Sequence, residues 1–333
     1  MKPMFTFIGS VAAMMAAAVV ISTASSPAAL TAVPHPGGRP PSAAEIQLGR
    51  SLFFEPRLSS NDKVSCGTCH KPEKGFADGL RFSVGVTGRP LRRHTPHLYN
   101  LAWNHTFFWD GRVSSLEEQA VAPVRNPEEM GMPADTAAAK LRGIDTYAAT
   151  FNELFPKSGV TMGNIARALA AFERTIVTHD SPADRYAAGD LTALDERAVR
   201  GRNLFMGRAR CTTCHSGLNF TDGLFHNTGV MGDDIGRAAF DRVGEFQMRP
   251  YPFFQMKRAF KTPSLRNVAL TAPYQHDGSE ATLLEVVTFY NKGGRDPQSY
   301  GKALDIRPLN LTESDLQDLV AFLESLTGVT DVQ

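Results

Sequence analysis

Residues 66–70 read Cys-Gly-Thr-Cys-His, and residues 211–215 repeat the pattern as Cys-Thr-Thr-Cys-His. C-x-x-C-H is the attachment sequence of a c-type haem, in which two thiols bind the vinyl groups and the histidine ligates the iron. A zinc half-site or a redox dithiol could use one such pair, but a four-Cys zinc site needs no histidine after each pair. The chain has 4 cysteines, and the two boxes use all of them. We therefore expect two covalently bound haem c groups with His70 and His215 as proximal ligands, attached through Cys66, Cys69, Cys211 and Cys214.

The sequence that follows the first box recurs after the second. Residues 95–102 (TPHLYNLA) match residues 262–269 (TPSLRNVA), and Asp110-Gly111 matches Asp277-Gly278, always 167 positions apart. A gapless offset over such a stretch indicates an internal duplication.

Hydrophobic spacing predicts helices in both copies. Helical patterns occupy 138–155, 162–177 and 313–326, and Ser42 has the character of an N-cap for a further helix that runs to Phe53. No run of residues predicts a strand. We expect an all-α fold of two cytochrome c-like haem domains related by duplication.

The N-terminus has the character of an export signal. Met4–Ile21 is apolar and rich in alanine, and the small residues Ser22-Thr23-Ala24 follow. A retained membrane anchor is the alternative, which we disfavour because alanine-rich segments insert weakly. Export also agrees with haem attachment in an oxidising compartment. We expect a periplasmic protein of a Gram-negative bacterium, with no membrane segment after cleavage, divided into a signal peptide (1–24), a flexible tether (25–42) and haem domains at 43–185 and 186–333.

Composition limits the class of partner. The 333 residues carry 35 Lys+Arg against 34 Asp+Glu, and 42% of the chain is hydrophobic. Such a chain is globular, and its balanced charge excludes a dedicated nucleic-acid binder.

The duplication allows the two iron sites to be compared. Pro123 of the first copy aligns with Tyr290 of the second. Proline cannot ligate iron whereas tyrosinate can, so we expect an open first haem and a tyrosine-capped second haem. Gln119 and Glu129 flank Pro123, and an amide with a carboxylate over an open haem is what peroxide activation needs. The alternatives are ordinary packing for Tyr290, surface positions for Gln119 and Glu129, and a methionine on the second iron from among Met231, Met248 and Met256.

Several segments carry a resemblance to a known family. They are FFWDGR (107–112), LEEQA (116–120), NPEEM (126–130), TPSLRNVALTAPYQHDG (262–278) and EVVTFYNKGG (285–294). These segments resemble the bacterial dihaem cytochrome c peroxidases, and more closely their MauG-like (MbnH-like) branch. The likeness covers residues 43 to 328.

The resemblance implies roles for individual residues. The N-terminal domain would be peroxidatic, with Glu129 and Gln119 at its distal face, and the C-terminal domain would transfer electrons. Trp109 falls where the family places a tryptophan between the haems. Tyr290 stands where classical peroxidases carry methionine and the MauG branch carries tyrosine. The loop 71–93 lacks the histidine that blocks the first haem of classical members.

The resemblance also implies an activity. Hydrogen peroxide would drive both haems to a high-valent state that oxidises tryptophan side chains on a partner protein. The alternative is a classical peroxidase that reduces hydrogen peroxide with electrons from a small cytochrome or cupredoxin. A plain electron carrier is a third class, and the groups around Pro123 argue against it.

Three departures from the family accompany this resemblance. MauG has an insertion before its FWDGR-like motif, which this chain lacks, and a surface tryptophan where this chain has Ala209, so the quinone-forming reaction is disfavoured.

The family also holds a calcium ion between the haems through backbone oxygens at positions matching Thr271 and Pro273. A third contact, often from asparagine, falls at His94. The resemblance implies calcium, with this substitution at one of its contacts.

Overall fold

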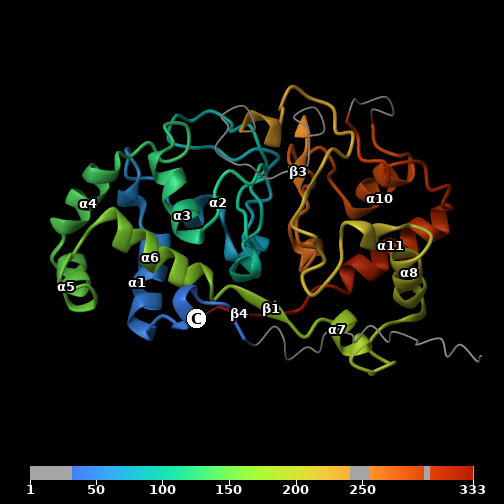
Figure 1. The fold of residues 1–333 in the computed structure, drawn as a ribbon, viewed down its shortest axis with the longest axis horizontal. Coiled ribbons are helices and arrows are strands. Elements are labelled where there is room, and N and C mark those ends of the chain that lie inside the picture. The colour runs from blue at the N-terminus through green and yellow to red at the C-terminus, as the bar shows by residue number, and fades with distance from the viewer. Residues whose placement is uncertain (1–31, 241–255, 296–300, 333) are drawn as a thin grey trace, which may run out of the picture.

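The computed structural model describes residues 32–240, 256–295 and 301–332. The expected signal peptide, residues 25–31 of the tether and Met248 lie outside these ranges. Figure 1 shows two halves side by side, the first coloured blue to green and the second yellow to red. The mostly helical class predicted from the sequence is confirmed. Within the described residues, no helix is long and apolar enough to cross a membrane.

The helices of the first half enclose one hydrophobic core. Helix α1 begins after Ser42, whose side chain and Glu45 form the expected capping box. The core of this half includes Leu52, Ile165 and Leu169, all of them fully buried. Its helices are α1 (Ala43–Phe53), α2 (Cys66–Cys69), α3 (Leu116–Arg125), α4 (Ala134–Arg142), α5 (Asp145–Leu154) and α6 (Met162–Glu173).

The described part of the second half repeats this helical arrangement. Its core gathers Phe205, Leu319 and Phe322. The helices from residue 182 onward are α7 (Pro182–Ala187), α8 (Glu196–Met206), α10 (Leu283–Asn291) and α11 (Glu313–Glu324). Single 3-10 turns along the described chain are Pro36–Gly38, Pro56–Leu58, Pro72–Lys74, Leu101–Trp103, Cys211–Thr213, Arg237–Ala239 and Val268–Leu270.

One glycine in each half sets the closest helix crossing. A Cβ on Gly49 of α1 would lie 1.8 Å from the carbonyl oxygen of Ala168 in α6. A Cβ on Gly201 of α8 would lie 1.8 Å from the carbonyl oxygen of Asp318 in α11. Only glycine permits this approach, because any side chain would overlap the facing backbone. The two halves therefore share this close helix contact as well as the sequence repeat.

Some element boundaries differ from the prediction. The pattern at 138–155 is two helices, because the backbone leaves the helical conformation at Ile144, where φ is −110° and ψ is 110°. The pattern at 162–177 stops as a helix at Glu173, and Val177–His179 forms strand β1.

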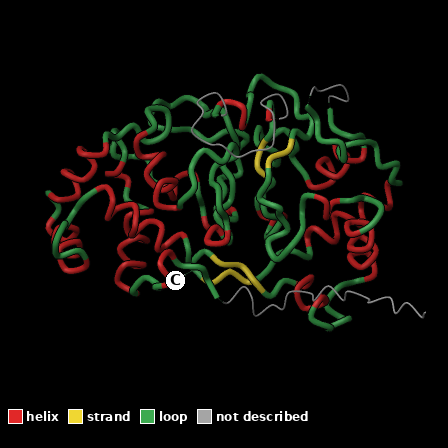
Figure 2. The backbone as a smooth tube through the Cα atoms, in the orientation of Figure 1, coloured by secondary structure: helices red, strands yellow, loops and turns green. Residues whose placement is uncertain are grey.

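Two short antiparallel ladders were not predicted. Strand β1 pairs with β4 (Val329–Asp331), and β2 (Phe225–His226) pairs with β3 (Phe260–Lys261). Strands of two or three residues are too short to show an alternating pattern, and segments distant in sequence form both ladders. Figure 2 shows these ladders near the middle of the molecule, with most helices toward its two sides.

Helix α7 packs with the second half, although the expected boundary after residue 185 runs through this helix. Ala183 belongs to the second hydrophobic core. The Arg266 guanidinium is almost completely buried and donates to both oxygens of Asp184, at 2.7 and 2.9 Å. A charge-assisted, bidentate pair of this kind fixes geometry as well as adding stability.

Backbone bonds between the halves follow the 167-residue offset. The His94 amide donates to the carbonyl of His276 at 2.8 Å, and the Lys261 amide donates to the carbonyl of Trp109 at 2.7 Å. The offset relates His94 to Lys261 and Trp109 to His276. The two bonds are therefore equivalent, and the halves meet about a local two-fold axis between these segments.

Candidate haem sites

Each half encloses a cavity at its own C-x-x-C-H box. The first cavity has a volume of about 850 Å³ and is lined by Cys66, Cys69 and His70. The second has a volume of about 190 Å³, and the attachment residues of the second box lie in its wall. The position of each box in a cavity wall is the arrangement that covalent haem attachment requires.

Both proximal histidines are oriented in the same way. His70 Nδ1 lies 2.8 Å from the carbonyl oxygen of Phe76, and His215 Nδ1 lies 2.9 Å from that of Phe220. A carbonyl can only accept, so Nδ1 carries the proton and Nε2 is left as the iron ligand. Burial lowers the pKa of both imidazoles, which favours the neutral, ligating form.

Unpartnered polar atoms at the cavity walls support the presence of a large bound group. Gln119 Oε1 and Glu173 Oε2 are buried without a hydrogen-bond partner at the first cavity, and Arg210 Nε is likewise unpartnered at the second. Buried polar atoms are normally satisfied, so such orphans point to a missing ligand or water. The residues present fit one haem c in each cavity.

The predicted distal residues of the first haem lie together. Gln119 and Pro123 are on α3, Glu129 follows that helix, and all three line the first cavity. Glu129 Oε1 accepts a hydrogen bond of 2.7 Å from the side-chain amide of Asn126, a residue that the sequence reasoning missed. Burial raises the pKa of Glu129, which brings its carboxyl toward the range useful for proton transfer. The Asn126 contact holds that carboxyl in place.

Tyr290 lies in the wall of the second cavity, together with His215. Burial raises the pKa of its phenol, so ionisation requires a cation at the hydroxyl, such as ferric iron. Of the two rival methionines that are described, Met231 is 63% exposed and lines the first cavity, and Met256 lines neither. The described part of the chain therefore brings Tyr290, and neither of these methionines, to the second haem site.

A shared wall divides the two cavities. Among the described residues, those that line both cavities form four pairs related by the 167-residue offset, namely His94 with Lys261, Pro96 with Pro263, His97 with Ser264, and Trp109 with His276. We call these residues the dividing wall. Burial lowers the pKa of His97 to about 4 and that of Lys261 to about 8. The wall is thus built around the local two-fold axis.

Trp109 is held rigidly within the dividing wall. Its indole Nε1 donates to the carbonyl of His94 at 2.8 Å, and its own carbonyl accepts from the Lys261 amide. Its ring meets that of His276 edge to face, with centroids 6.5 Å apart. The indole of Trp109 is thus fixed in place at the border of the two cavities.

Glu173 is a second site residue that sequence reasoning missed. It is almost fully buried at the C-terminal end of α6 and lines the first cavity. Burial raises its pKa to about 8. Phe172 and Phe322 occupy equivalent positions, so the counterpart of Glu173 is Leu323, which lines the second cavity. A comparison of the two copies could have identified Glu173, because Phe172 is followed by a glutamate whereas Phe322 is followed by a leucine.

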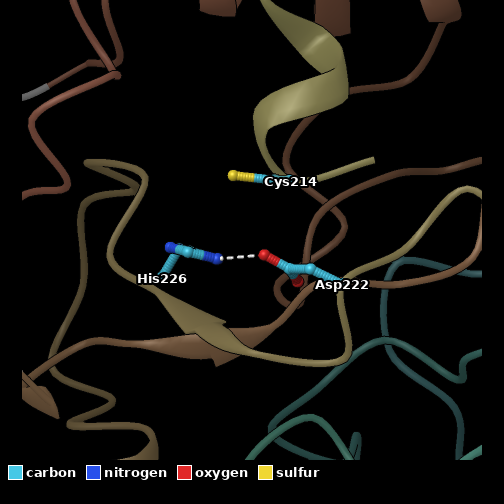
Figure 3. A group of neighbouring side chains, drawn as sticks. All are labelled: Cys214, Asp222 and His226. Carbon is cyan, nitrogen blue, oxygen red and sulfur yellow. Dashed lines mark hydrogen bonds and ion pairs between the residues drawn. The ribbon is translucent and has the colours of Figure 1, made fainter. Parts of the chain in front are cut away.

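Figure 3 shows Cys214, Asp222 and His226, whose ligand atoms all lie within 4.8 Å of one another. His226 Nε2 lies 2.8 Å from Asp222 Oδ2. Such a trio could hold a metal ion, but a thioether to haem removes the Cys214 thiolate from the set. The pair Asp222–His226 then remains as a polar contact beside the second haem.

The residues expected around a calcium ion lie close to one another in the structure. Thr271, Pro273 and His94 do gather at the second cavity. The His94 ring donates through Nδ1 to the backbone carbonyl of Leu80, at 2.9 Å.

Family models match both halves. A model described as di-haem cytochrome c peroxidase matches residues 43–192, and one described as cytochrome c matches residues 198–327. The chain is 42% identical over 296 residues to the methylamine utilization protein MauG of Methylorubrum extorquens, covering 88% of this chain and 81% of that protein. It is 36% identical over 302 residues to the cytochrome c551 peroxidase of Pseudomonas aeruginosa, covering 87% and 81%.

A solved structure shares the fold as well. It is described as a MauG-like protein associated with microbial copper homeostasis, with 34% identity and a TM-score of 0.76, and the match covers 89% of this chain and 92% of that one. The two haem c sites, the duplicated fold and these relatives agree with one another. The chain belongs to the dihaem cytochrome c peroxidase and MauG family of haem peroxidase-type enzymes.

Proposed function

We propose that this enzyme uses hydrogen peroxide to oxidise tryptophan side chains on a partner protein. The observation that carries the proposal is the inequality of the two cavities. Pro123 in the first cavity has no atom that could ligate an iron, whereas Tyr290 in the second cavity would supply an anionic oxygen to an iron bound there. An electron-rich axial ligand stabilises high oxidation states of iron, which agrees with an enzyme that stores oxidising equivalents.

The distal residues of the first cavity provide the acid–base chemistry. When bound, the haems supply the redox chemistry by which peroxide is reduced at the first site and oxidising equivalents reach the second. Glu129 takes a proton from one peroxide oxygen and returns it to the other, which becomes the leaving water. Asn126 orients Glu129, and the unpartnered Gln119 Oε1 accepts a hydrogen bond from bound peroxide.

The dividing wall suits the sharing of oxidising equivalents. Trp109 borders both cavities, and its Nε1–H is bonded to a backbone carbonyl that cannot take the proton away. Oxidation of the ring therefore need not be coupled to proton loss. We assign Trp109 as the relay between the sites.

The partner is proposed to be a protein that meets the enzyme outside the cytoplasm. The N-terminal segment is proposed to direct export to the periplasm, where both haems are attached. One structural relative is described as associated with microbial copper homeostasis, so a copper-handling protein that exposes tryptophan is a reasonable first candidate.

A classical peroxidase is the second candidate, favoured by 36% identity to the cytochrome c551 peroxidase. That enzyme class would draw electrons from a small cytochrome or cupredoxin. The two functions differ in whether the fully oxidised enzyme reacts with peroxide.

We expect the diferric holoenzyme to react with peroxide without prior reduction and to give a near-infrared charge-sharing signature. The variants Y290M and Y290H should lose that signature while retaining both haems, because the anionic ligand is gone. Y274F is the matched control, since Tyr274 lines the same cavity and bonds only a backbone carbonyl through its hydroxyl, at 3.1 Å. A reaction that requires half-reduction would favour the classical peroxidase.

The partner reaction needs its own measurement. The enzyme and peroxide are incubated with the product of a neighbouring gene, and mass shifts are located on its tryptophan residues. Oxygen addition at tryptophan in the presence of both, and not with Y290M, is the expected result. A diferric enzyme that reacts with peroxide but modifies no tryptophan would contradict the proposed substrate.

A further inference from the structure

Tyr290 lies in the last turn of a short helix, α10, which ends at Asn291. The last turn of a helix lacks part of its backbone hydrogen bonding and frays readily. A side chain at this position therefore needs support from outside the helix to stay at the wall of the second cavity.

The residue after Tyr290 provides such support. The Asn291 side chain accepts from the Leu311 amide through Oδ1 at 2.9 Å and donates through Nδ2 to the Leu311 carbonyl at 3.1 Å. The backbone carbonyl of Asn291 also accepts from the Leu309 amide, at 3.0 Å. We call these three hydrogen bonds the α10 clamp.

The segment that the α10 clamp reaches is itself anchored. Leu311 is 7% exposed and belongs to the second hydrophobic core. The next residue, Thr312, caps α11, because its Oγ1 accepts from the Asp315 amide at 3.2 Å. Leu309 lines the second cavity together with Tyr290. The clamp therefore joins the turn that carries Tyr290 to the fixed start of α11.

The first half keeps only the backbone part of this arrangement. The 167-residue offset relates Asn291 to Val124 in α3. The Val124 carbonyl accepts from the Met132 amide at 2.7 Å, much as the Asn291 carbonyl accepts from the amide of Leu309. The Val124 side chain is fully buried in the first core and has no hydrogen-bonding group. The side-chain bonds of the clamp are thus a feature of the second copy, which contains Tyr290.

We propose that Asn291 is a positioning residue that holds Tyr290 on the second iron and keeps that iron closed to outside ligands. The inference rests on the proposed ligation by Tyr290. An outside ligand reaches the second iron only in the fraction of molecules in which Tyr290 has moved away, so its apparent affinity follows that fraction. By lowering the fraction, the clamp restricts outside ligands, peroxide among them, to the first haem.

The test is a cyanide titration of the resting diferric holoenzyme, followed by absorption and by electron paramagnetic resonance of each haem. Cyanide binds ferric iron at an open axial position. We expect wild type to bind it tightly at the first haem, and at the second only at much higher concentration. N291V places the first-copy residue in the second copy and removes both side-chain bonds. Its second haem should bind cyanide about 10- to 100-fold more tightly.

N164V is the matched control in the first half. Asn164 is also buried, and its side chain donates to the Gly159 carbonyl at 2.7 Å and to Ser158 Oγ at 2.9 Å. Its replacement removes comparable hydrogen bonds, but Asn164 lies in α6 and lines neither cavity. The cyanide affinity of the second haem should therefore stay at the wild-type value.

An unchanged second-haem affinity in N291V would overturn the proposal, as would an equal change in N164V. If N291V does not fold with two haems, N291D decides, because it keeps an acceptor for the Leu311 amide and loses the donor. N291D should also bind cyanide at the second haem more tightly than wild type, and a wild-type affinity would overturn the proposal.

Y290F separates this test from that of the proposed function. Its second iron has no phenol oxygen to displace, so it should bind cyanide at least as tightly as N291V does. A wild-type titration in Y290F would overturn both proposals, because Tyr290 would then not be the ligand. A response in Y290F with none in N291V would overturn only the role of Asn291. Cyanide binding is measured without peroxide or partner, so a failure to oxidise tryptophan would leave the clamp standing.

Discussion

The first and second halves of the molecule share a scaffold but differ in what lines it. Both pair an N-terminal helix with a C-terminal helix through a glycine, and both orient the proximal imidazole through a phenylalanine carbonyl. The cavities differ where chemistry is decided, in Pro123 against Tyr290 and Glu173 against Leu323. Duplication thus preserved the contacts that hold a haem and changed the groups that control its reaction.

The largest expected effect comes from substitutions at the glycines of the two close helix crossings. G49A or G201A would place a Cβ 1.8 Å from a facing carbonyl oxygen, and the helices would have to separate. We expect each to cost more than about 3 kcal/mol of unfolding free energy, measured by denaturant titration of the holoenzyme. G163A in α6 is the control, because its nearest contact is 3.9 Å away, and it should change stability by less than about 1 kcal/mol. Comparable losses in all three would show that the close crossings are unimportant.

The next effect tests the chemistry that only the first half carries. E129Q keeps an oxygen for the Asn126 bond and cannot shuttle a proton, so the peroxide reaction should slow by about 10²- to 10⁴-fold in stopped-flow kinetics. E128Q is the control, since Glu128 lines the same cavity but is exposed. An unchanged rate in E129Q would remove the acid–base role.

The smallest expected effect comes from replacing Glu173, where leucine is the residue that the second cavity has at the equivalent position. Glu173 has a pKa of about 8 in the folded protein, against 4.5 for the ordinary carboxyl, so the folded state binds its proton more tightly. Stability from this group is therefore present at low pH and is lost as pH rises toward 8. We expect wild type to lose about 2 kcal/mol more than E173L or E173Q between pH 6 and 8, by denaturant titration. Parallel pH profiles in the three proteins would contradict a neutral, buried Glu173.

Local signals predicted the features that depend on nearest neighbours. Short stretches of sequence are enough to recognise the capped start of α1, the two haem boxes and the 167-residue repeat. The repeat also identified Tyr290, because an inequality between copies is visible without a structure. The split between α4 and α5 and the two short ladders were missed, since they depend on packing against distant segments.

The site shows the same division. Sequence alone selected Gln119, Pro123, Glu129 and Trp109, which the structure brings to the first cavity. Asn126 and Glu173 were missed because an orienting contact and a buried carboxyl are defined by burial and distance, which spacing does not report. His94 was noted as a departure, but the contact of its ring with Leu80 appears only in three dimensions.

The sequence by itself determined that the chain attaches two haems and carries two unequal copies of one unit, because covalent attachment and duplication leave marks on neighbouring residues. Only the tertiary structure decided how the copies meet. The dividing wall brings together residues that lie 167 positions apart in the sequence. Their geometry depends on the packing of both halves, and no local pattern encodes the distance between them.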